Sequence, residues 1–167
     1  MVRKMIAVIG GSECDEKGIE LAEKLGEAIA KKGATLICGG RGGVMEAACR
    51  GAKKFNGLTI GLLPSLDKKD ANSFVDIVIP TGLGYARNFI VAQAGDAVIA
   101  IAGSAGTLSE MAIAWFSDKP VIALESSGGW AKKLAGEAID SRRTDVVHSA
   151  STPGEAVEIA FNVLGWE

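Results

Sequence analysis

The chain has 167 residues, of which 48% are hydrophobic and only 5% aromatic, with 22 glycines and a formal net charge of −2. This length fits one domain, residues 1–167, and the near-neutral charge argues against nucleic-acid or membrane-surface partners. The three cysteines show no C-x-x-C spacing and no apolar run approaches the ~20 residues of a membrane span, so we expect a reduced, cytoplasmic protein.

Short apolar runs alternate with helical patterns along the chain. This alternation predicts an α/β fold: a single doubly wound Rossmann-like domain with a parallel sheet of six or seven strands and helices on both faces. The polar segment 65–73 lacks periodicity and is expected to be a mobile loop. Strands are expected at residues 5–9, 35–38, 58–63, 75–79, 97–102, 121–124 and 145–148. Helices are expected at residues 15–32, 44–54, 107–116, 130–139 and 153–164, and a further helix carries Tyr85, Arg87, Asn88 and Ile90.

Three glycine-rich turns follow expected strands, at residues 10–12, 39–43 and 103–106. Right-handed crossovers place the carboxyl ends of parallel strands at one edge of the sheet, so these turns should converge on one mouth. The free N–H groups of a helix that starts after such a turn favour an anion, and glycines let a ligand approach the backbone. We therefore expect a phosphate-binding site formed by Gly11, Ser12, Gly39, Gly40, Arg41, Gly42, Gly43, Asn88, Gly103, Ser104, Gly106 and Thr107.

Two arginines at this mouth favour a ligand-binding role. Arg41 has two glycines on each side and therefore no core to join. Neighbouring helix N-termini also disfavour a cation unless an anion is present. Arg87 lies in the first turn of its expected helix, where the helix dipole prefers Asp or Glu. Departures of this kind from local preference are expected at functional sites.

Glu110 has two interpretations that its spacing does not separate. With Thr107 it fits the S/T-x-x-D/E capping box, as Ser12 does with Asp15. In that case the Glu110 carboxylate would serve its own helix. Alternatively, Glu110 faces the mouth and places a carboxylate one turn inside the expected anion site.

Several well-known nucleotide-binding and catalytic motifs are absent from the sequence. The first turn does not read G-x-G-x-x-G, and no carboxylate follows the second strand to hold a ribose, which disfavours NAD. There is no P-loop and no G-x-S-x-G nucleophile elbow. His148 is the only histidine and lies far from the turns, so no metal site is expected.

Three segments carry a family resemblance. Residues 102–110 read Ala-Gly-Ser-Ala-Gly-Thr-Leu-Ser-Glu, residues 39–45 read Gly-Gly-Arg-Gly-Gly-Val-Met, and residues 84–88 read Gly-Tyr-Ala-Arg-Asn. Taken in chain order, these segments resemble the LOG-like superfamily of Rossmann-type proteins, whose members were once mislabelled lysine decarboxylases. The first segment resembles the signature P-G-G-x-G-T-x-x-E, residues 39–45 are most similar to the molybdenum-cofactor carrier branch, and residues 84–88 lie where cytokinin-activating members carry M-x-x-R-K. Ala102, Ser104 and Asn88 replace the proline, a glycine and the lysine of these patterns.

The resemblance implies two alternatives for function. The leading hypothesis is a binding protein for a phosphorylated pterin or nucleotide-like ligand, with molybdenum cofactor as cargo and no required cofactor of its own. It also implies a homodimer or homotetramer, with the helix that carries Arg87 near the subunit interface. The alternative is a nucleoside 5′-monophosphate phosphoribohydrolase, in which Arg87 and Glu110 would be catalytic. Only one carboxylate can be placed in the mouth, whereas glycoside hydrolases usually use two, and no lysine lies on the signature turns to support a decarboxylase.

Overall fold

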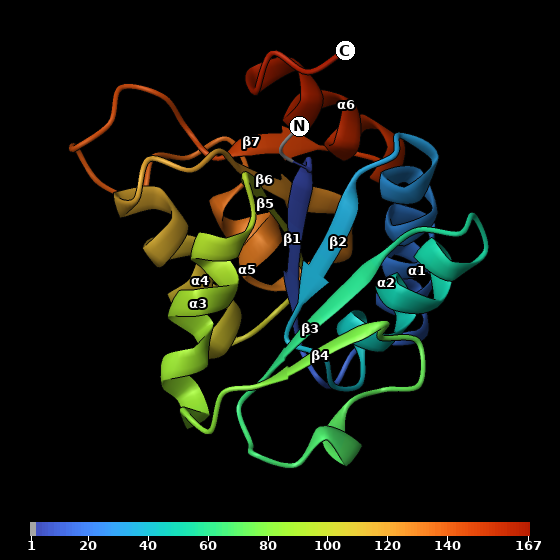
Figure 1. Cartoon of the computed structure of the whole chain (residues 1–167). Coiled ribbons are helices and arrows are strands. Elements are labelled where there is room, and N and C mark those ends of the chain that lie inside the picture. The colour runs from blue at the N-terminus through green and yellow to red at the C-terminus, as the bar shows by residue number, and fades with distance from the viewer. Residues whose placement is uncertain (1–2) are drawn as a thin grey trace.

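The computed structural model describes residues 3–167 and contains one seven-stranded sheet (Figure 1). All neighbouring strands are parallel, so the doubly wound Rossmann-like prediction is confirmed. The strands are β1 (Met5–Gly10), β2 (Thr35–Cys38), β3 (Thr59–Leu63), β4 (Ile77–Pro80), β5 (Ala97–Ile101), β6 (Val121–Leu124) and β7 (His148–Ala150). Their order across the sheet is β4-β3-β2-β1-β5-β6-β7.

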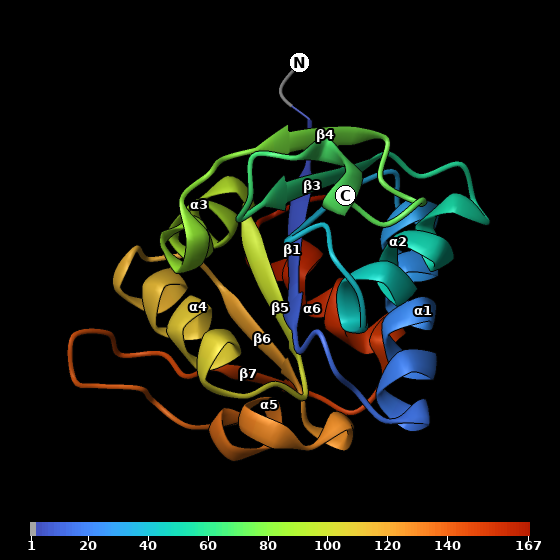
Figure 2. The same cartoon turned by 90° about the horizontal axis from the view of Figure 1, so that it is seen from below.

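Helices cover both faces of the sheet, three on each side (Figure 2). One face carries α1 (Glu16–Lys31), α2 (Val44–Lys53) and α6 (Pro153–Val163), and the other carries α3 (Arg87–Ala94), α4 (Ala105–Phe116) and α5 (Gly129–Leu134). Short 3₁₀ turns are η1 (Lys68–Asp70), η2 (Gly84–Ala86) and η3 (Glu125–Ser127). Within residues 3–167, no helix combines the length and the apolar character that a bilayer span requires.

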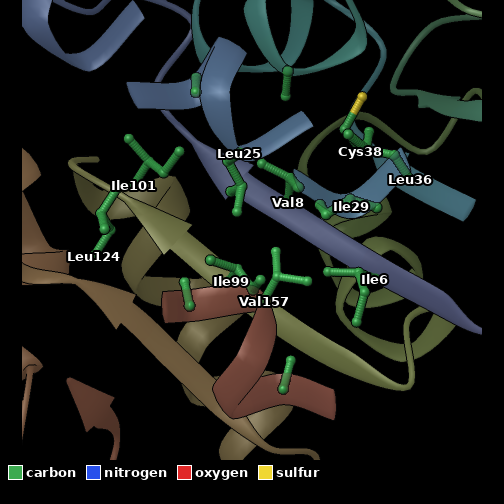
Figure 3. Packing of buried hydrophobic residues seen from close by; sticks show 14 of the residues in the cluster. Ile6, Val8, Leu25, Ile29, Leu36, Cys38, Ile99, Ile101, Leu124 and Val157 are labelled. Atoms are coloured by element: carbon green, nitrogen blue, oxygen red, sulfur yellow. The ribbon is translucent and has the colours of Figure 1, made fainter. Parts of the chain in front are cut away.

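Alternate residues of β1 enter two separate cores, one under each helical layer. Val8 packs with Leu25 of α1 and Val157 of α6 (Figure 3), whereas Ile9 belongs to the core under α3 and α4. These side chains are almost fully buried, and each contributes about 1.5–3 kcal/mol through removal from water. Small residues bring α1 and α2 together, because a Cβ on Gly26 would overlap with the Ala48 carbonyl.

Several element boundaries differ from the sequence prediction. Strand β4 begins at Ile77 instead of residue 75, and Tyr85 lies in η2, so α3 begins at Arg87. Three further differences have a local reason. Helix α4 begins at Ala105, two residues early, because the extended backbone of Ser104 ends the preceding turn. Helix α5 is shorter than expected, and residues 135–147 form an irregular connection. This connection is held by Arg143, whose guanidinium donates to the Lys119 carbonyl at 2.8 Å. Strand β7 therefore begins at His148 instead of residue 145.

Candidate functional site

A cavity of about 550 Å³ opens where β1, β2, β3 and β5 end. Its walls come from the turns after these strands and from the first turns of α3 and α4, as the sheet topology predicts. The lining includes nine of the residues predicted for the mouth: Gly11, Ser12, Arg41, Arg87, Asn88, Ser104, Gly106, Thr107 and Glu110. It also includes Gly10, Met45, Pro64, Gly84 and Tyr85, which the sequence prediction did not include among the site residues.

Five glycines predicted to contact the ligand, Gly39, Gly40, Gly42, Gly43 and Gly103, do not line this cavity. Gly40, at φ +77°, lies against Gly61 of the neighbouring strand, and a Cβ there would meet the Gly61 Cα at 3.1 Å. Gly43 and Gly103 pack against the Ser12 carbonyl and the Thr107 side chain. For four of these glycines, contacts within the protein explain the need for glycine. A Cβ on Gly42 would meet only Oε2 of Glu46 and the Ser12 carbonyl, both at an ordinary contact distance of 4.0 Å.

Arg87 is the first residue of α3, and its guanidinium lies beside Gly39 at the end of β2. A Cβ at Gly39 would overlap with Nη1 of Arg87, so glycine at this position is what makes room for the arginine. The Nε atom of Arg87 is buried and has no hydrogen-bond partner within residues 3–167. Burial lowers the pKa of Arg87, and attraction to Glu110 partly offsets this effect. Arginine remains charged in proteins, so Arg87 brings an uncompensated cation to the cavity.

Glu110 lies on the second turn of α4 and faces the cavity. It is only 8% exposed, and none of the described residues forms a hydrogen bond or an ion pair with it. Burial raises the pKa of the Glu110 carboxyl to about 8, against the lowering influence of the Arg87 charge. At neutral pH the group is therefore mostly a neutral acid that can donate a hydrogen bond into the cavity.

The two capping-box interpretations at the mouth are wrong. Thr107 lies inside α4, whose N-cap is Ser104, so Glu110 does not serve a box with it. Helix α1 is capped by Asp15, whose Oδ1 accepts from the Gly18 N–H at 2.7 Å. Ser12 is therefore left free on the cavity wall.

The segment 65–73 forms hydrogen bonds with the turn that carries Arg41. Asn72 donates from Nδ2 to the Arg41 carbonyl at 2.8 Å and from its backbone N–H to the Gly40 carbonyl at 2.9 Å. The Arg41 side chain itself is exposed at the rim of the cavity. Opposite this turn, the first N–H groups of α4 have no intrahelical acceptors. The cavity thus joins two arginines with a helix N-terminus, an arrangement that suits a phosphate.

Comparison with known proteins defines the family. Residues 3–157 match the model of the SLOG cluster4 family. The chain belongs to this family. The expected resemblance to the LOG-like superfamily, near the molybdenum-cofactor carrier branch, is therefore confirmed.

Two solved structures of similar proteins extend over nearly the whole chain. The molybdenum cofactor binding protein from the phototrophic bacterium Rippkaea orientalis is 39% identical, with a TM-score of 0.88, and the match covers 98% of this chain and 99% of that one. The molybdenum cofactor carrier protein of Chlamydomonas reinhardtii is 34% identical over the same shares, with a TM-score of 0.84.

An enzyme is also among the relatives of this SLOG cluster4 protein. The cytokinin riboside 5′-monophosphate phosphoribohydrolase of Mycobacterium tuberculosis is 33% identical over 119 residues, which is 66% of this chain. The match spans 64% of the enzyme, less than two thirds of its length. The relatives of this chain thus include both a carrier protein and a hydrolase.

Proposed function

We propose that this protein binds molybdenum cofactor, a phosphorylated pterin, in the cavity at the carboxyl edge of the sheet. The observation that carries the proposal is the meeting of Arg41, Arg87 and the N-terminus of α4 around a space of about 550 Å³. A helix N-terminus and two guanidinium groups favour a phosphate at this place. The likeness to two molybdenum-cofactor proteins over nearly the full chain supports the same ligand.

The protonation state of Glu110 is compatible with an anionic ligand. A carboxylate buried beside the phosphate would repel it, whereas a neutral acid does not. Because the pKa of Glu110 is raised to about 8, the cavity keeps the positive charge of its arginines at neutral pH. The same acid can donate a hydrogen bond to an oxygen of the ligand.

Thermal unfolding with and without molybdenum cofactor tests the proposal. A ligand that binds only the folded chain stabilises it by about 2.7 kcal/mol at a hundredfold excess over its dissociation constant. We expect the stabilisation in the wild-type protein and its loss in Arg41→Ala. Arg142→Ala is the matched control, because Arg142 is exposed and pairs with Asp140 away from the cavity. Equal stabilisation of wild type and Arg41→Ala would contradict the placement of the phosphate.

A second candidate function, hydrolysis of a nucleoside 5′-monophosphate, is favoured by the position of Glu110. The acid faces the cavity beside Arg87, as hydrolysis of an N-glycosidic bond would require. Water would add to the anomeric carbon as the bond to the base breaks. The Glu110 proton would go to the leaving base, and the resulting carboxylate would take the proton that the water loses. Incubation with AMP, GMP and CMP and assay of the free base tests this function. Release that Glu110→Gln abolishes would establish hydrolysis, and absence of release would exclude it for these nucleotides.

We also propose that a second copy of the chain covers an apolar surface beside the cavity. The surface, here called the α3–β4 patch, comprises Ile77, Ile79, Leu83, Tyr85 and Phe89, with Tyr85 95% exposed and Phe89 50% exposed. Ile77 and Ile79 pair with Ile60 and Leu62 of β3 and project to the α3 side of the sheet. Exposed apolar side chains gathered on neighbouring elements are typical of protein interfaces. A symmetric dimer through α3 would follow the expectation from the family resemblance.

A further inference from the structure

Asn88 follows Arg87 in the first turn of α3, and hydrogen bonds fix the orientation of its side-chain amide. Its Nδ2 donates to Oγ of Ser109 on α4 at 3.2 Å. That hydroxyl donates its own hydrogen to the Gly106 carbonyl at 2.6 Å. Because serine has a single hydroxyl hydrogen, Ser109 can only accept from Asn88. The reverse orientation of the amide would set two lone pairs against each other.

The fixed orientation leaves the amide oxygen of Asn88 available to a ligand. The Nδ2 side of the amide faces α4, where a Cβ on Gly106 would lie 3.8 Å from it. Oδ1 therefore points away from α4, and none of residues 3–167 donates to it. Asn88 lines the cavity, and because no donor within residues 3–167 reaches its Oδ1, this acceptor is open to a ligand there.

An acceptor oxygen held in this way does not suit a phosphate. Phosphate oxygens are acceptors as well and would be repelled, whereas an N–H or O–H group would be bound. The positive charge needed for a phosphate comes from Arg41 and Arg87. Oδ1 of Asn88 therefore serves a donor group on another part of the ligand, and only the second Nδ2 hydrogen is left for the phosphate contact that the sequence predicts.

We infer that Asn88 determines specificity by accepting a hydrogen bond from an N–H or O–H group of a phosphorylated ligand, with Ser109 as the positioning residue for its amide. The inference rests on the proposed function only in assuming that a phosphorylated ligand occupies this cavity. Heterocycle N–H groups and sugar hydroxyls offer the same chemistry. Sites that hydrogen-bond such a group reject ligands that lack it, because the acceptor loses its water beneath the ligand and gains no partner.

Dissociation constants of wild type, Asn88→Leu and Ser109→Ala test the inference, with molybdenum cofactor and inorganic phosphate as probes. We expect Asn88→Leu, which keeps the size of the side chain, to weaken cofactor binding about 5- to 100-fold. Phosphate binding should change less than about twofold, since Arg41 and Arg87 are untouched. Ser109→Ala frees the amide to rotate and should weaken cofactor binding by a smaller factor, so it tests the same claim if the leucine variant misfolds.

Nucleotide probes separate failure of this inference from failure of the proposed function. If the wild type binds phosphate and AMP or GMP but no cofactor, the proposed cargo is wrong, and Asn88→Leu is tested on the nucleotides. If Asn88→Leu binds AMP more weakly than wild type does but binds 2′-deoxy-AMP equally well, Asn88 accepts from a sugar hydroxyl. If Asn88→Leu also binds 2′-deoxy-GMP more weakly, Asn88 accepts from the heterocycle. Three results would overturn the inference. Asn88→Leu could lose as much affinity for phosphate as for the larger ligand, it could bind every probe as wild type does, or wild type could bind none of the probes.

Discussion

Two residues of the cavity, Arg87 and Glu110, occupy positions that helix electrostatics and burial disfavour. Arg87 stands at a helix N-terminus, where the dipole disfavours a cation, and its Nε is buried without a partner among residues 3–167. Glu110 is buried in the same cavity and is mostly neutral at pH 7 because its pKa is raised to about 8. An anionic ligand would satisfy the arginine and leave the acid free to donate a hydrogen bond. The pair therefore favours a bound anion.

Substitution of Gly39 by alanine should displace Arg87, because the added Cβ would overlap with the guanidinium. We expect Gly39→Ala to weaken ligand binding at least about tenfold, the change that loss of about 1.4 kcal/mol of a charged contact produces. Titration calorimetry with molybdenum cofactor measures this. Gly154→Ala is the control, since a Cβ there meets no atom within 4 Å. Unchanged affinity in Gly39→Ala would show that the position of Arg87 does not matter for binding.

The raised pKa of Glu110 predicts how stability depends on pH. Between about pH 4.5 and pH 8 the unfolded chain loses the Glu110 proton and the folded chain keeps it. The free energy of unfolding contributed by this group is therefore full below about pH 4.5 and falls as the pH rises towards 8. We expect urea unfolding of Glu110→Gln to show a smaller decline over this range than wild type. Parallel profiles of wild type and Glu110→Gln would contradict a buried, neutral Glu110.

At the scale of elements, the site depends on hydrogen bonds between the segment 65–73 and the turn at residues 39–43. Asn72 of the segment 65–73 bonds to the Gly40 and Arg41 carbonyls and so holds the turn before α2. Removal of one such bond costs about 1 kcal/mol. The segment lacks regular structure apart from η1, yet it restrains the residue expected to bind phosphate.

Asn72→Ala should loosen the turn at residues 39–43 without unfolding the sheet. Its backbone N–H bond to Gly40 remains. The three side-chain bonds are lost, two from Nδ2 to the Gly40 and Arg41 carbonyls and one from the Phe74 N–H to Oδ1. We expect faster hydrogen exchange in peptides that cover residues 39–45 and unchanged exchange in β1 and β5. Asn162→Ala, on the exposed side of α6, serves as the control. Identical exchange in wild type and Asn72→Ala would mean that other contacts hold the turn.

The alternation of apolar strands and helices is enough to predict the sheet, its parallel strands and the edge that carries the cavity, because burial on both faces imposes that pattern. The role of Glu110 is not predictable in this way, since T-x-x-E spacing is the same whether or not Thr107 caps a helix. The extended backbone of Ser104 makes Ser104 the N-cap of α4 and so excludes a capping box between Thr107 and Glu110.

The sequence pattern assigns Gly39 and Gly40 to the ligand, because glycine makes room equally for a ligand, a side chain or a strand. Neither Met45 nor Pro64 has a side chain whose chemistry predicts a ligand contact, and packing places both on the cavity wall.

At the scale of the whole molecule, the cavity and the α3–β4 patch share the connection from β4 to α3. Figure 2 shows β4 at the edge of the sheet with α3 beside it. Tyr85 belongs to both, since it lines the cavity and is almost fully exposed. A second copy on this patch would therefore lie next to the ligand, and assembly and binding should be linked.

Phe89→Glu should separate the proposed dimer, because a charge in the centre of an apolar interface loses its water without a partner. Light scattering after gel filtration should give the mass of the dimer for wild type and of the monomer for Phe89→Glu. Phe116→Glu is a matched control, as Phe116 is similarly exposed but lies on α4 outside the patch. A wild-type monomer, or a Phe89→Glu dimer, would contradict this interface.

The central claim is that the cavity holds molybdenum cofactor through Arg41 and Arg87. The most direct measurement is the molybdenum and pterin content of the purified protein after incubation with the cofactor and gel filtration. We predict that both co-elute with wild type in stoichiometric amount and that neither co-elutes with Arg41→Ala. Absence of both from wild type, or equal amounts in wild type and Arg41→Ala, would contradict the claim.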